Sequence, residues 1–230
     1  MWKWSKQPSH SGAQGMLGGV FRRLRRDYVR HELVEASAAL DPFTQFTDWF
    51  AAAARSCSGE VNAMALATVS SAGSPSNRMV LLKDFDREGF VFFTNYASRK
   101  GQELASHSAA AILFYWGELE RQVRVEGVVE QVERTRSADY FHSRPREAQL
   151  SALVSEQSRE VESRAKLEEA LEAARREYAG QEIPLPEAWG GYLLRPKRFE
   201  FWQGRRGRLH DRLAYELEVG GGWRRYRLAP

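Results

Sequence analysis

Cationic and aromatic side chains are the residues of this chain that could do chemistry, and they gather in four short stretches. The stretches cover residues 78–83, 92–101, 140–146 and 200–212. Guanidinium and ammonium groups bind phosphate, and aromatic rings lie against flat heterocycles. These residue types therefore favour the binding of planar, phosphorylated molecules.

The first two stretches each predict an anion site near a strand. Arg78 and Lys83 end an apolar run and, being five residues apart, point to opposite faces of a regular strand. The two side chains would therefore bind anions at two adjoining subsites, or share one subsite if the strand contains a bulge. The alternative is that they are only solvated strand ends. Ser98 is a good N-cap, and Arg99 and Lys100 follow it, which predicts a phosphate cradle at a helix start.

The third stretch predicts a second anion site. Tyr140 and Arg144 are four residues apart, so on a helix they share one face and could bind a phosphate together. Bases near a helix C-terminus also compensate the helix dipole, and this alternative stays open.

The fourth stretch combines cations with a histidine. Arg208, His210 and Arg212 alternate, so in an extended segment they present three potential cations on one face. Trp202 precedes them and could lie against a flat ring. A lone histidine is more often structural than catalytic, but the flanking arginines favour a functional role here.

The sequence lacks the residues that other common chemistries require. The sequence has no Ser/His/Asp set, no acidic dyad and no cluster of metal ligands, and no glycine-rich nucleotide motif follows a strand. The single cysteine, Cys57, is interpreted as a buried structural thiol. We therefore expect a bound cofactor to supply the chemistry and no metal to take part.

The net charge of +4 fits an anionic partner, and the distribution of charge indicates which kind. Arginines recur along the whole chain instead of forming the single stripe of a nucleic-acid binder, which favours small phosphorylated ligands. No apolar run approaches the ~18–20 residues that span a bilayer, and no apolar signal segment follows Lys3 and Lys6. We expect a cytoplasmic protein.

Apolar periodicity predicts the elements that position the four stretches. Asp41 and Pro42 start a helix whose aromatic residues share one face. Further helices are expected at 98–107, 134–143, 146–154 and 161–179, and strands at 64–70, 77–83, 90–95, 110–116, 121–132, 191–194, 198–203, 213–219 and 223–228. The strands come as neighbouring antiparallel runs with helical insertions, so the fold class is α+β, mostly antiparallel, on a small barrel.

The chain is expected to divide into a tail and one domain. Residues 1–20 are rich in Ser, Gly and Gln and lack periodicity, which predicts a flexible tail and makes Met16 a candidate start. Residues 21–33 predict a basic helix or an arm that orders on binding. We expect residues 21–230 to form a single domain.

Several motifs make the chain resemble the pyridoxine/pyridoxamine 5′-phosphate oxidase family. In chain order they are R-M-V-L-L-K, F-F-T-N-Y-A-S-R-K-G, L-E-R-Q-V, Y-F-H-S-R-P-R, E-F-W-Q-G, R-L-H-D-R and R-L-A-P. The resemblance runs from about Arg22 to Pro230, and the motifs together are far more specific than any one alone. It implies an FMN-binding split β-barrel and a homodimer with FMN at the subunit interface.

The resemblance also implies roles for individual residues. One subunit would hold FMN through Arg78, Met79, Val80, Leu81, Leu82, Lys83, Phe93, Thr94, Arg99 and Lys100. The partner subunit would complete the site with Gln122, Gln157, Ser158, Trp202 and Arg212. The substrate phosphate would meet Lys83, Tyr140 and Arg144, while Arg208 and His210 would be the catalytic residues over the pyridine ring. Arg25 and Tyr28 would close over the bound substrate.

The implied reaction oxidises pyridoxine 5′-phosphate and pyridoxamine 5′-phosphate to pyridoxal 5′-phosphate by hydride transfer to FMN, with O2 reoxidising the flavin to give H2O2. Ala148 departs from the family pattern, which places a serine in contact with the substrate phosphate there. Two other interpretations remain: a non-catalytic flavin or pyridoxal-phosphate binder on the same barrel, and a basic nucleic-acid-binding module.

Overall fold

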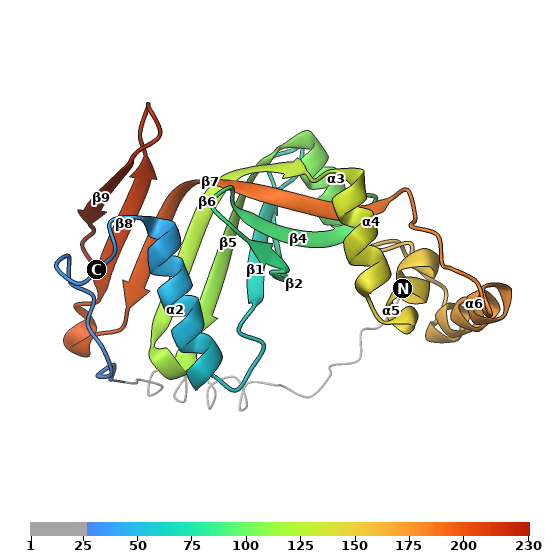
Figure 1. Ribbon diagram of the computed structural model, residues 1–230, viewed down its shortest axis with the longest axis horizontal. Coiled ribbons are helices and arrows are strands. Elements are labelled where there is room, and N and C mark those ends of the chain that lie inside the picture. The colour runs from blue at the N-terminus through green and yellow to red at the C-terminus, as the bar shows by residue number, and fades with distance from the viewer. Residues whose placement is uncertain (1–26) are drawn as a thin grey trace, which may run out of the picture.

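The computed structural model describes residues 27–230, which fold into an antiparallel sheet with helices on it and at one end (Figure 1). The helices are α2 (Pro42–Ser56), α3 (Arg99–Ser106), α4 (Arg134–Ser143), α5 (Arg146–Val154) and α6 (Arg164–Glu177), with short 3-10 turns η1 (Gly117–Leu119) and η2 (Arg206–Arg208). The strands are β1 (Ala63–Val69), β2 (Pro75–Leu81), β3 (Asp84–Phe85), β4 (Phe90–Asn95), β5 (Ala109–Trp116), β6 (Arg121–Gln131), β7 (Trp189–Gln203), β8 (Asp211–Leu217) and β9 (Trp223–Arg227). No helix in this part of the chain is both long and apolar enough to cross a membrane.

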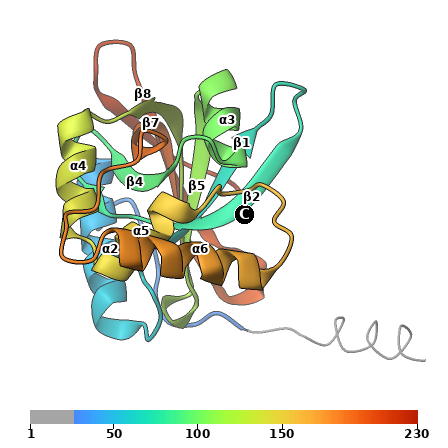
Figure 2. The same cartoon turned by 90° about the vertical axis from the view of Figure 1, so that its right-hand side faces the viewer.

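The nine strands form one sheet in the order β2-β1-β5-β6-β7-β4-β3, with β8 beside β7 and β9 beside β8. β7 is the strand at which the sheet divides. Its residues 189–194 pair with β4 and its residues 198–203 pair with β8, while β6 runs along its other edge. The sheet therefore curls into a barrel that is split beside β7 (Figures 1 and 2).

The sequence predicted a break in this strand at Pro196, but β7 is continuous. Gly127 pairs with Pro196 and Glu126 pairs with Arg198, so Lys197 is the extra residue of a β-bulge. A bulge tolerates proline because the ladder is already interrupted there.

Helix α2 forms as predicted and covers the main core. The Asp41 carboxylate accepts a hydrogen bond from the Thr44 amide at 3.0 Å, and Pro42 occupies the first turn. The apolar face packs on the sheet, where the ring centroids of Phe46 and Phe90 lie 4.9 Å apart.

A second, smaller core joins α4, α5 and α6 to the start of β7, at the opposite end of the molecule from β9 (Figures 1 and 2). Its buried residues are Phe141, Leu150, Ala174, Ile183 and Trp189. Helix α6 begins later than predicted, because the Ser163 side chain caps it by accepting from the Lys166 amide. This end of the fold places α4 and α5 near strand β4.

Candidate active site

A cavity of about 520 Å³ is lined by residues of β2, β4, α4 and α5. It brings together most of the residues that the sequence assigned to one subunit. Its lining includes Met79, Val80, Leu81, Lys83, Phe93, Thr94, Lys100, Tyr140 and Arg144. Residues from three of the four stretches, 78–83, 92–101 and 140–146, therefore meet at one place.

Arg78 and Lys83 serve different parts of this region. Lys83 lies beyond the end of β2 and lines the cavity, whereas the Arg78 guanidinium turns toward α3 and meets the Glu103 carboxylate at 3.1 Å. Of the alternatives open from the sequence, two adjoining subsites fit this geometry. Leu82 is buried at 7% exposure and packs into the main core, so its side chain points away from the cavity.

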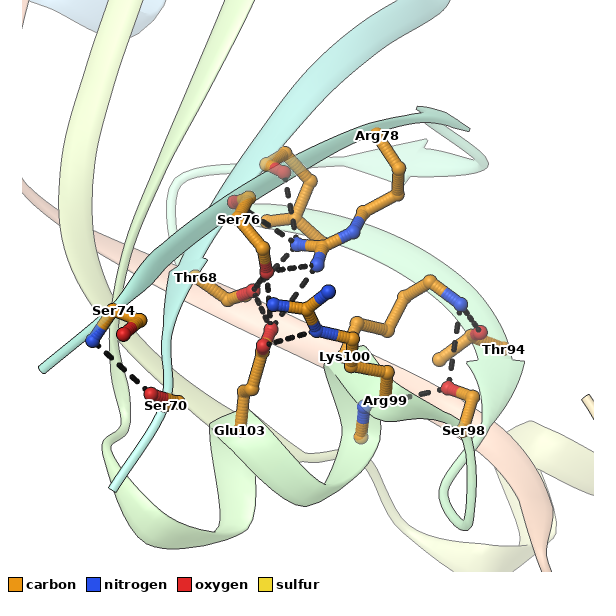
Figure 3. Close-up of polar contacts among 12 residues, drawn as sticks. Thr68, Ser70, Ser74, Ser76, Arg78, Thr94, Ser98, Arg99, Lys100 and Glu103 are labelled. Carbon is orange, nitrogen blue, oxygen red and sulfur yellow. Dashed lines mark hydrogen bonds and ion pairs between the residues drawn. The ribbon is translucent and has the colours of Figure 1, made fainter. Parts of the chain in front are cut away.

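The start of α3 gathers polar side chains around an ammonium group (Figure 3). Ser98 caps the helix, as predicted. The Lys100 ammonium is buried and donates to Thr94 Oγ1 at 3.1 Å and to Gln157 Oε1 at 2.6 Å. Burial, helped by the nearby charge of Arg78, lowers the pKa of Lys100 to about 8. This cation therefore titrates closer to neutrality than an exposed lysine does.

Gln157 reaches the cavity from the same chain. The family resemblance assigned this residue to the partner subunit, but in the structure the loop after α5 folds back against β4 of its own chain, where Asn95 Nδ2 donates to the Ser155 carbonyl at 3.3 Å. The neighbouring residue, Ser158, adopts a left-handed backbone conformation with φ of 73°.

Arg144 is the C-cap of α4, but its guanidinium stacks on aromatic rings. The ring of Trp189 lies 4.8 Å from its Cζ, and Phe93 and Tyr140 stack at 4.0 Å beside it. Within the described residues, Arg144 Nη1 is buried and has no hydrogen-bond partner. A guanidinium with a buried, unused Nη1 donor beside a cavity is suited to binding an anion.

The sequence did not predict two residues that support this site, Trp189 and Glu103. Trp189 supports Arg144 from 45 positions along the chain, and Glu103 pairs with Arg78 from 25 positions away. Long-range contacts of this kind leave no local pattern. The only local signal was the spacing of Arg99 and Glu103, which is that of a helical ion pair.

The remaining predicted residues lie in a second group at the other end of the molecule. Gln122, Trp202 and Arg212 form a row across β6, β7 and β8, because the strand register pairs Gln122 with Trp202 and Trp202 with Arg212. Figure 1 shows the turn between β7 and β8 far from α4 and α5. Within one chain, the structure does not bring this group to the cavity.

His210 belongs to this second group and has a defined hydrogen-bonding state. Its Nδ1 accepts from the Arg205 amide at 3.1 Å, so Nε2 is the nitrogen that carries the proton in the neutral ring. Burial and the charge of Arg208 lower the pKa of His210. The ring lies 4.6 Å from that of Trp202, and Tyr28 packs against both rings at 5.6 Å.

Arg208, Tyr28 and Arg25 are the other predicted residues of the turn and the arm. Arg208 has a left-handed backbone with φ of 62°. Tyr28 is held in place because Glu120 Oε2 accepts from the next two amides, those of Val29 and Arg30. Arg25 lies outside the described residues.

Two family models match the chain. Residues 50–177 match the model described as Pyridoxamine 5'-phosphate oxidase, and residues 189–230 match the Pyridoxine 5'-phosphate oxidase C-terminal dimerisation region. Relatives named pyridoxine/pyridoxamine 5'-phosphate oxidase include proteins of Microcystis aeruginosa, at 52% identity, and Ralstonia nicotianae, at 55% identity. Each alignment covers 90% of this chain and 97% of the relative.

Solved structures show the same architecture. PhzG from Burkholderia lata, solved in complex with tetrahydrophenazine-1-carboxylic acid, is 32% identical, has a TM-score of 0.79 and shares 86% of this chain and 98% of its own. A pyridoxamine 5'-phosphate oxidase-related, FMN-binding protein from Nostoc punctiforme has a TM-score of 0.67 at 18% identity, over 84% of this chain and 100% of its own.

The curled antiparallel sheet that divides beside β7, together with these structural similarities, defines a split-barrel protein. Within that class, the extent of the sequence matches decides the family. The chain belongs to the pyridoxamine 5′-phosphate oxidase family.

Proposed function

We propose that this protein oxidises pyridoxine 5′-phosphate and pyridoxamine 5′-phosphate to pyridoxal 5′-phosphate, with FMN as cofactor and O2 as electron acceptor. The observation that carries the proposal is the presence of two separate cationic groups at one cavity. One surrounds the start of α3 and includes Lys100, and the other is Arg144 beside Tyr140. Two phosphorylated ligands bound side by side need two anion sites, and the names of the relatives agree with this pairing.

The residues near α3 fit the phosphate of FMN. Arg78, Arg99 and Lys100 supply three positive charges and Glu103 supplies one negative charge, so the group carries a net charge of +2 when all four are ionised. A phosphate monoester carries about −2 at neutral pH, and amides at a helix start add donors. The apolar wall formed by β2 offers a surface for the flat ring system.

The chemistry that FMN would supply when bound is acceptance of a hydride from C4′ of the substrate, after which O2 would take the two electrons to give H2O2. The alcohol substrate would also lose its hydroxyl proton to give the aldehyde, whereas the amine substrate would give an imine that water hydrolyses to the aldehyde and ammonia. The residues of the chain hold the substrate for that transfer. Arg144, Lys83 and Tyr140 bind its phosphate. His210, neutral and protonated at Nε2, donates a hydrogen bond toward the pyridine ring, and Arg208 stabilises the charge that develops there.

We infer that His210 and Arg208 reach the cavity from a second copy of the chain. In one chain these residues lie with Trp202 and Arg212 at the end opposite to α4 and α5 (Figure 1). All four fall within residues 189–230, the segment that matches a dimerisation region. A homodimer would thus contain two equivalent sites, each built from both chains.

Oxygen uptake by the FMN-loaded protein tests the proposal. Pyridoxine 5′-phosphate is expected to start uptake, with the product aldehyde followed by its absorbance, whereas unphosphorylated pyridoxine is expected to give little. No uptake by a folded, flavin-containing protein would contradict the enzyme and favour a non-catalytic flavin binder. Equal uptake with both compounds would contradict the assignment of Arg144 to the substrate phosphate.

A further inference from the structure

Glu103 is a carboxylate buried among guanidinium and hydroxyl groups on α3 (Figure 3). Its side chain is 5% exposed. Oε1 accepts from Arg99 Nε at 2.9 Å, while Oε2 accepts from Arg78 Nη2 at 3.1 Å and from Ser76 Oγ at 2.6 Å. Thr68 donates to the same Oε2. Each carboxylate oxygen therefore holds one arginine.

The carboxylate is ionised at every pH at which the protein would work. Burial alone would raise the pKa of Glu103, but hydrogen bonds from two hydroxyls and two guanidinium groups outweigh burial and lower it to about 2. Charge-assisted hydrogen bonds of this kind fix direction as well as distance. The two guanidinium groups are consequently oriented before any ligand arrives.

The two arginines depend on Glu103 to different degrees. Arg78 is 19% exposed and is also fixed by the carbonyl of Leu66, to which its Nη1 donates at 3.1 Å. Arg99 is 63% exposed, and its Nε donates to the Glu103 carboxylate (Figure 3). Loss of the carboxylate would therefore release Arg99 into many rotamers, and ordering it again would oppose ligand binding.

The negative charge of Glu103 also offsets the repulsion between the positive charges of Arg78 and Lys100. Arg78 lowers the pKa of Lys100 through its charge, and Glu103 acts in the opposite direction. Without the carboxylate, the Lys100 ammonium group would lose its proton more readily beside the Arg78 guanidinium. The negative charge of Glu103 therefore favours the charged form of Lys100 at the start of α3.

We propose that Glu103 is a positioning residue of the flavin phosphate site: it does not touch the phosphate, and it holds Arg78 and Arg99 where they bind it. The inference rests on the proposed FMN site. A carboxylate near a phosphate repels it, so the proposal requires that orientation of the arginines outweighs this repulsion.

The test compares FMN with riboflavin, which has the same ring system and no phosphate. The full-length protein, freed of flavin, is titrated with each compound, and quenching of flavin fluorescence gives the dissociation constants. In Glu103→Gln, which keeps the side-chain volume, affinity for FMN is expected to fall roughly 10-fold or more, as for loss of hydrogen bonds to a charged group. Affinity for riboflavin is expected to stay unchanged.

Three outcomes would overturn the assignment of Glu103. Tighter FMN binding in Glu103→Gln would mean that repulsion dominates. An equal loss of FMN and riboflavin affinity would mean that the residue only supports the fold, and unchanged FMN affinity would mean that the arginines need no carboxylate. If the unaltered protein shows no preference for FMN over riboflavin, the proposed flavin site itself fails.

Two further variants keep the test decisive. Ser76→Ala removes one hydroxyl that donates to the carboxylate, and it provides a second test if Glu103→Gln does not fold. It is expected to weaken FMN binding selectively, but less than Glu103→Gln does. An equal loss of FMN and riboflavin affinity, or an unchanged FMN affinity, would contradict the proposal. Glu130→Gln removes the same charge from an exposed pair with Arg195 and is expected to bind both flavins normally. Thermal unfolding of each variant separates a loss of stability from a loss of selectivity.

Discussion

At the residue scale, the surroundings of Arg144 indicate an anion site most directly. Its buried Nη1 has no hydrogen-bond partner among residues 27–230, which costs free energy until a ligand accepts a hydrogen bond from it. In Arg144→Ala, KM for pyridoxine 5′-phosphate is expected to rise roughly 10- to 100-fold, since a hydrogen bond to a charged group is worth about 1.5–3 kcal/mol. The rate at saturating substrate should change less. Steady-state oxygen uptake measures both.

The matched control for Arg144→Ala lies on the same helix. Arg136 pairs with Asp84 at 2.6 Å and does not line the cavity, so Arg136→Ala is expected to leave KM unchanged. A comparable rise in KM in both variants would show that the effect comes from α4 as a whole and not from a phosphate contact.

The lowered pKa of Lys100 predicts that flavin binding depends on pH. Its pKa is lowered to about 8, so the ammonium loses its proton as pH rises through that value, while the FMN phosphate stays dianionic above about 6. Affinity for FMN is therefore expected to fall as pH increases from about 7 to about 9, and affinity for riboflavin to stay flat. In Lys100→Arg the cation does not deprotonate in this range, so a persistent fall in FMN affinity would rule out Lys100 as its cause.

Local patterns pointed to cations of the cavity such as Lys100 and Arg144, and the family resemblance added the apolar lining, but neither indicated the residues that support the cations. Ser98 as an N-cap and the helical spacing of Tyr140 and Arg144 are visible within a few positions of the sequence. Glu103 and Trp189 act on residues far along the chain, and only the packing of α3 on the sheet and of α4 on β7 brings them into contact. Long-range packing of the loop after α5 on β4 likewise brings Gln157 to the cavity of its own chain.

At the scale of elements, apolar periodicity predicted the helices and most strands, because buried faces repeat at the period of each element. It predicted two strands, at 191–194 and 198–203, where the structure has the single strand β7 with Pro196 within it. The bulge that accommodates it depends on pairing with β6, which the sequence of β7 alone does not reveal.

The segment that carries Tyr28 gives a prediction at this scale. A Cβ at Gly204 would lie 2.6 Å from Tyr28 Cγ, so Gly204→Ala must displace the tyrosine ring, while Glu120 keeps hold of the amides beside it. We expect KM for pyridoxine 5′-phosphate to rise roughly fivefold, the equivalent of about 1 kcal/mol of lost contact. Gly59→Ala, with open space around its Cβ, is the control. An unchanged KM would exclude Tyr28 from the closure over substrate.

At the scale of the whole molecule, the two groups of site residues lie at opposite ends of one chain, so the proposed catalyst exists only as a dimer. Mixing two variants, each impaired when the substrate concentration is near the KM of the unaltered protein, tests this arrangement. Arg144→Ala would disable the substrate phosphate group of a chain, and Arg208→Ala would disable the group that the same chain lends to its partner. Each variant alone would form dimers with two impaired sites.

Dissociation and reassociation of an equal mixture would make half of the dimers mixed, each with one intact and one doubly altered site. We therefore expect recovery of about one quarter of the activity of the unaltered protein, measured as oxygen uptake with pyridoxine 5′-phosphate. The intact site would appear because Arg144 from one chain meets Arg208 from the other. No recovery, with mixed dimers demonstrated by mass spectrometry, would mean that each chain builds its site alone, and the second group would then need another function.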